Sequence, residues 1–77
     1  MKLRVRGKVF NTTKKEVEQK LTGIEPEPGV KYFVVTKGKE YPIKQVVSKA
    51  FSLSRADFVT QEAYRILRRL GFKIVER

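Results

Sequence analysis

Hydrophobic and polar residues alternate from the start of the chain. The apolar parity holds Leu3, Val5, Gly7 and Val9, and the other parity holds Lys2, Arg4, Arg6 and Lys8. A period of two predicts a half-buried strand over residues 2–9. Its outer face would carry a row of four cations. This row indicates either contact with phosphates or protection of an edge strand against aggregation.

The pattern then changes to a short helix, a loop and a hairpin. Thr13 and Glu16 match the capping box and predict a helix over residues 13–21. Two prolines and a glycine predict a loop over 24–29. Residues 30–36 are mostly β-branched or aromatic, which predicts a central strand, and Gly38 favours a tight turn after it.

The most regular apolar stripe follows this hairpin. Pro42 suits the first position of a helix. Apolar residues then recur at helical spacing: Ile43, Val46, Val47, Ala50 and Phe51. The opposite face, predicted to be exposed, holds Lys44, Gln45, Ser48 and Lys49.

A second amphipathic helix is predicted after an eight-residue connection over 52–59. Thr60 would cap this helix, which runs over about 61–70, and Gly71 would end it. Its inward face holds Ala63, Ile66, Leu67 and Leu70. A closing strand is predicted around Ile74.

These elements predict a single α+β domain over residues 1–77. The expected architecture is a small three- to four-stranded sheet with three helices, in the order β-α-β-β-α-α-β. The two helices within 42–70 form a helix-turn-helix-like pair, in which the second helix would contact DNA.

Composition narrows the function classes. The chain has 77 residues, 18 Lys or Arg, eight Asp or Glu, and neither His nor Cys. The commonest general base, metal ligand and thiol nucleophile are therefore missing, so we expect no enzyme activity, no cofactor and no metal. No apolar run approaches a membrane span and the N-terminus lacks the apolar centre of a signal peptide, so we expect a cytoplasmic protein without membrane or small-molecule partners.

The formal net charge of +10 is the first positive indication of function. Such a field attracts polyanions, and nucleic acid is the expected partner. A thermophile composition is the alternative explanation, but it enriches both signs of charge whereas the excess here is one-sided. The acidic segment 16–27 separates two basic ones, which predicts a basic side and a more neutral side.

The second helix of the pair holds the strongest candidate contacts. Arg65, Arg68 and Arg69 share one outward stripe, where they could grip phosphates or guanine edges. Cations near a helix C-terminus also offset the macrodipole, which is the structural alternative. Gln61, near the other end of the helix, has the donor and acceptor pair that recognises adenine.

Further candidates lie outside that helix. The basic candidates are Arg4 and Arg6 on the first strand and Lys44 and Lys49 on the first helix of the pair. Among the aromatic residues, Phe33, Phe51, Phe58 and Phe72 are expected in the core. Tyr32, Tyr41 and Tyr64 are either core residues or exposed platforms for unpaired bases.

One stretch of the chain resembles a known family. The residues that carry the resemblance are Lys31-Tyr32-Phe33, Gly38, Tyr41-Pro42-x-Lys44, Asp57-Phe58 and Leu67-x-x-Leu70-Gly71-Phe72. They are similar to the small N-terminal accessory domain of some prokaryotic HNH-type, modification-dependent restriction endonucleases. Val59-Thr60 replaces the glycine pair of that pattern. The resemblance implies a DNA-associated module without the nuclease, in which Lys44 is the matched polar residue that could touch DNA.

The sequence therefore predicts a non-catalytic protein that binds double-stranded DNA mainly through phosphate contacts. The alternatives are an RNA- or ribosome-associated basic protein and a protein-interaction module with an acidic partner. Of the two basic clusters, the arginines of the second helix are expected to contribute more to binding than those of the first strand.

Overall fold

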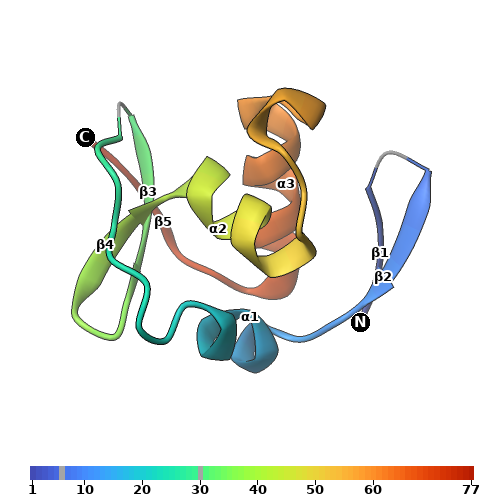
Figure 1. Cartoon of the computed structure of the whole chain (residues 1–77), viewed down its shortest axis with the longest axis horizontal. Helices are drawn as coiled ribbons and strands as arrows, with labels where there is room; N and C mark the ends of the chain where they lie inside the picture. Colours follow the sequence, from blue (N-terminus) through green and yellow to red (C-terminus); the bar gives the residue numbers. More distant parts are fainter. Residues whose placement is uncertain (6, 30) are drawn as a thin grey trace.

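The computed structural model describes residues 1–5, 7–29 and 31–77 as an α+β fold (Figure 1). The elements in chain order are β1 (Lys2–Val5), β2 (Lys8–Asn11), α1 (Lys14–Lys20), β3 (Tyr32–Thr36), β4 (Lys39–Pro42), α2 (Ile43–Phe51), a 3-10 turn (Arg55–Asp57), α3 (Thr60–Leu70) and β5 (Ile74–Glu76). The α+β class and the three predicted helices are confirmed. Arg6 and Val30, which were included in the predicted strands, lie outside the described residues.

Three strands form one antiparallel sheet in the order β4-β3-β5. Val34 pairs with Tyr41 on one side and with Ile74 on the other, and it is fully buried. The predicted hairpin turn is present between β3 and β4, where Lys37 and Gly38 both have positive φ (52° and 75°). A turn with two positive φ angles matches the twist of the strands it joins.

The prediction of a single strand over 2–9 is wrong. Val5 pairs directly with Lys8, so the chain reverses between them, and Gly7 adopts φ 82° there. β1 and β2 therefore form a separate two-stranded hairpin. The reversal moves the even positions of β2 to the inner face: Phe10 packs against Phe51, while Val9 is 60% exposed.

The helix ends differ from the prediction by about one residue. The Thr13 hydroxyl accepts a hydrogen bond from the Glu16 N–H (3.2 Å), as expected of the cap of α1. Pro42 precedes α2 rather than beginning it. Thr60 is the first residue of α3, and the Glu62 carboxylate instead caps this helix by accepting from the Val59 N–H (3.1 Å). The residues just before α2 and α3, Pro42 and Val59, thus occupy the cap positions of these helices.

The helices lie between the sheet and the hairpin (Figure 1). α2 is the central element, and its apolar stripe is buried as predicted. The predicted inner face of α3 is also buried, and Gly71 ends the helix with φ 97°. Together these faces and Leu3, Val17, Leu21 and Phe72 form one core.

Two side chains are placed differently from the sequence interpretation. Gln45, predicted on the exposed face of α2, is only 2% exposed. Phe33 lies outside the buried core, because the alternate positions Val34 and Thr36 are the ones that face the helices.

Candidate nucleic-acid interface

A polar groove of about 280 Å³ runs between the hairpin and α3. We call it the hairpin groove. Its lining residues are Leu3, Arg4 and Val5 of β1, and Glu62, Arg65, Ile66 and Arg69 of α3. The sequence presented the strand arginines and the helix arginines as competing clusters, whereas the structure brings Arg4 together with Arg65 and Arg69.

The three arginines of the hairpin groove are exposed, and none of them forms an ion pair with another residue that the structure describes. Glu62 lines the same groove and caps α3 through the Val59 N–H. Among the described residues, three cations thus share the groove with one carboxylate. An arginine guanidinium presents donors that match a phosphate bidentately, so the groove can accommodate a phosphate oxygen pair.

Arg68 faces a different neighbour from the other helix arginines. Its guanidinium donates to the Tyr64 hydroxyl (3.4 Å) and its central carbon lies 5.9 Å from the centre of the Tyr64 ring. All three helix arginines are exposed, as predicted. The stripe therefore spans the outer face of α3, with Arg65 and Arg69 toward the hairpin and Arg68 toward Tyr64.

Gln61 is exposed in the first turn of α3, where it lines a shallow pocket with Tyr32, Thr60 and Tyr64. The two tyrosine side chains are half-buried, and their rings pack edge to face with their centres 5.3 Å apart. Tyr41, the third predicted candidate for stacking, is excluded from that role. It is buried, and its hydroxyl donates to the Ile24 carbonyl (2.8 Å).

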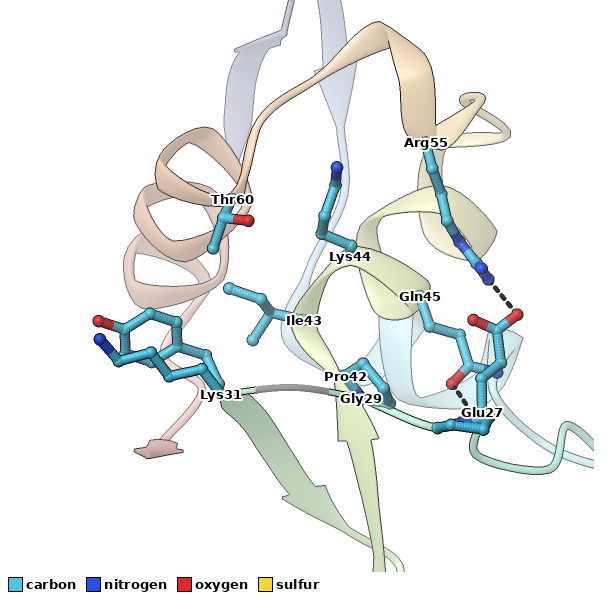
Figure 2. Close-up of a pocket in the computed structure, with 11 residues that line it drawn as sticks. Glu27, Gly29, Lys31, Pro42, Ile43, Lys44, Gln45, Arg55 and Thr60 are labelled. Atoms are coloured by element: carbon cyan, nitrogen blue, oxygen red, sulfur yellow. Dashed lines mark hydrogen bonds and ion pairs between the residues drawn. The ribbon is translucent and has the colours of Figure 1, made fainter. Parts of the chain in front are cut away.

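The two lysines of α2 point in different directions. Lys44 is half-buried, with its Nζ 5.3 Å from the centre of the Phe58 ring, and lines the pocket shown in Figure 2. Lys49 follows five residues later, about 140° further round the helix. It is exposed and lines none of the three pockets described here.

Most glutamates near the sheet already have a cationic partner. The ion pairs are Lys31–Glu76 (3.4 Å), Lys39–Glu25 (3.1 Å), Arg55–Glu27 and Arg77–Glu40. Electrostatic interactions with Tyr32 and with the Glu76 carboxylate raise the pKa of Lys31, and the hydrogen bond to Glu40 raises that of Arg77. Both cations thus stay charged at neutral pH. Four of the eight carboxylates of the chain thus lie in the sheet and the loop before it, each paired with a cation.

Sequence reasoning missed the pocket of Figure 2, which is built from the loop before β3 and the start of α2. Lys31, Tyr32, Ile43 and Arg55 line it together with Lys44. The available signal was the Pro26-Glu27-Pro28-Gly29 segment, whose composition shows a loop but not what holds it in place.

None of the described helices has the length and apolar character that a membrane span requires. Within the same residues, no group of three or more acidic side chains is placed to hold a metal ion.

The whole chain, residues 1–77, matches the SCO5918-like family, and the protein belongs to that family. No curated protein and no solved structure matches the chain. The resemblance of residues 31–72 to the accessory domain of HNH-type endonucleases stays a prediction.

Proposed function

We propose that this protein is a non-catalytic DNA-binding module that binds duplex DNA through α3 and the adjacent hairpin. One observation carries the proposal: Arg4, Arg65 and Arg69 come from two separate elements but line one exposed groove, without an ion-pair partner among the described residues. In a chain with a net charge of +10, this arrangement suits a phosphate of a polyanion.

The shape of the basic side supports duplex DNA as the polyanion. α3 has 11 residues, which corresponds to a length of about 16 Å. Gln61, Arg65 and Arg68 follow one another at i, i+4 and i+7 along its exposed face. A helix fits the major groove of B-DNA, which is about 12 Å wide. With α3 in that groove, the hairpin beside it would meet the flanking phosphate backbone through Arg4.

Phosphate contacts would dominate and base contacts would be few. Arg65 and Arg69 would bind the phosphates near the hairpin, whereas Gln61 has the amide that can pair with an adenine edge. The resemblance of residues 31–72 to a DNA-associated module agrees with this assignment. Lys49 would contribute only to the general positive field.

The test is a binding titration of the full chain against a duplex DNA, a single strand of the same sequence and a structured RNA at three salt concentrations. We expect the duplex to bind most tightly. The slope of log K against log salt should be about −3, because each of about three phosphate contacts contributes about −0.9. Absence of duplex binding at about 50 mM salt, or tighter binding of the RNA, would overturn the proposal.

A further inference from the structure

A second pocket, of about 360 Å³, lies on the other flank of α3 from the hairpin groove. We call it the loop pocket, because the loop before β3 forms one wall (Figure 2). Its apolar lining comes from Pro28, Tyr32, Pro42 and Ile43. The volume is at the small end of the range of about 300–1,000 Å³ for ligand sites, which suits one nucleotide-sized group.

A buried amide holds this wall in place. The Gln45 Nε2 donates to the Glu25 carbonyl (2.9 Å), and its Oε1 accepts from the Glu27 N–H (2.9 Å). Glu27 is also paired with Arg55, and both residues line the pocket (Figure 2). These contacts hold Glu25 and Glu27 of the loop against Gln45 and Arg55.

Gly29 allows the loop to pack closely against its neighbours. A Cβ at this position would lie 2.6 Å from the Phe33 Cε2 and 2.7 Å from the Pro42 Cγ. Both distances are too short for a real side chain. The absence of a side chain thus lets the backbone of the loop lie directly on Pro42, at the floor of the pocket.

The charge at the rim determines what the pocket can hold. Lys31 and Arg55 already have glutamate partners, whereas Lys44 forms no ion pair with any described residue. Figure 2 shows the Lys44 side chain above Ile43 and to the right of Thr60, and its Nζ lies 5.3 Å from the centre of the Phe58 ring. Tyr32 contributes an aromatic ring that also contacts Lys31 and Tyr64. An apolar cavity with such a ring and an ammonium without a described carboxylate partner is complementary to a flat ring that carries a negative group. A nucleotide has both.

From these contacts we infer that the loop pocket holds an unpaired nucleotide of the bound nucleic acid. Its base would lie against Tyr32 and Ile43, and its phosphate would meet Lys44. The inference rests on the proposed DNA binding. Thr60 lines the loop pocket and is the first residue of α3, so a base that leaves the duplex beside α3 would reach the pocket.

The chain offers its own reporters for an NMR test. It contains four isoleucines, of which Ile43 lines the loop pocket, Ile66 lines the hairpin groove, and Ile24 and Ile74 line neither. A sample with labelled isoleucine methyl groups is titrated with three probes. These are a fully paired duplex, the same duplex with one unpaired adenine, and free deoxyadenosine monophosphate.

We expect the Ile66 methyl signals to shift with both duplexes, and the Ile43 methyl signals to shift only with the duplex that has the unpaired base. Shifts of Ile66 without any shift of Ile43 would overturn the inference and leave the proposed function standing. Equal Ile43 shifts with the paired duplex, or with the free nucleotide at the same concentration, would also overturn it. If no methyl shifts with either duplex, the proposed function itself fails.

A matched pair of variants tests the phosphate contact. We expect wild type to favour the duplex with the unpaired adenine about tenfold over the paired one. Lys44→Ala should abolish most of that preference, whereas Lys49→Ala, on the same helix, should keep it. Since both variants lose one charge, the ratio of the two affinities removes the general effect of charge. A preference that survives Lys44→Ala would contradict the assignment.

Discussion

Gln45 illustrates how a single side chain departs from the pattern around it. Its position on the face of α2 opposite the apolar stripe predicts an exposed residue, yet its side chain is buried because it bonds backbone groups of Glu25 and Glu27. A buried amide is stable only when its donors and acceptors are satisfied. In the described part of the chain, no buried side-chain polar atom lacks a hydrogen-bond partner.

We expect Gln45→Ala to destabilise the fold by about 2–3 kcal/mol, because it removes two hydrogen bonds and leaves a backbone donor and acceptor unpaired. Chemical denaturation measures the change in the free energy of unfolding. Gln19→Ala, an exposed site on α1, is the control and should change it by less than about 0.5 kcal/mol. Equal effects of the two substitutions would show that the hydrogen bonds of Gln45 contribute nothing to stability.

Val46 tests the opposite case, in which the pattern predicted the environment correctly. Its side chain is fully buried. Val46→Asp would place an uncompensated charge in the core, and we expect a loss of about 3–5 kcal/mol. That is a large part of the stability of a small domain. Val35→Asp is the matched control, because Val35 is 48% exposed on the outer face of the sheet. Thermal unfolding by circular dichroism should show a cooperative transition for the control alone.

At the scale of elements, α2 and α3 were predictable because one apolar stripe repeats at helical spacing over two or more turns. The hairpin was not. Apolar and polar residues alternate through the turn without a break. Before the turn the odd positions Leu3 and Val5 face the core, whereas after it the even position Phe10 does. Gly7 within the alternating segment was the available sign, because glycine in a strand interior often marks a bend. The hairpin groove depends on that turn, so its combination of strand and helix arginines could not be predicted.

The groove makes a prediction about coupling between two elements. If Arg4 and Arg69 bind the same phosphate, loss of one weakens the contact of the other. The double variant Arg4→Ala/Arg69→Ala should therefore lose less duplex affinity than the sum of the single losses, by at least about 0.5 kcal/mol. Fluorescence anisotropy at one fixed salt concentration gives the four affinities.

The control cycle pairs Arg4→Ala with Lys49→Ala, since Lys49 lies on α2 and does not line the hairpin groove. These two losses should add. Additive losses in both cycles would mean that the strand and the helix contact separate phosphates.

At the scale of the whole molecule, the net charge was known from the sequence, but its division into two sides was only partly predictable. The acidic segment 16–27 suggested a neutral side. However, Glu25 and Glu27 pair with Lys39 and Arg55, which are distant in sequence. Such pairs depend on the tertiary fold, and exposed pairs of this kind add little stability. Their effect is to pair cations of the sheet and the 3-10 turn with carboxylates, whereas Arg4, Arg65 and Arg69 have no ion-pair partner among the described residues.

This division predicts that the position of a charge, rather than the total, controls DNA binding. Arg65→Ala/Arg69→Ala and Lys39→Ala/Arg77→Ala each lower the net charge of +10 by two. The first pair removes groove contacts and should lower the slope of log K against log salt by about two contacts. The second pair removes cations that already face Glu25 and Glu40, so its slope should stay close to that of wild type.

Duplex binding at three salt concentrations compares the two double variants, and circular dichroism verifies that each variant is folded. Equal losses of slope would show that the protein attracts DNA through its overall charge, and that the hairpin groove has no special part in binding.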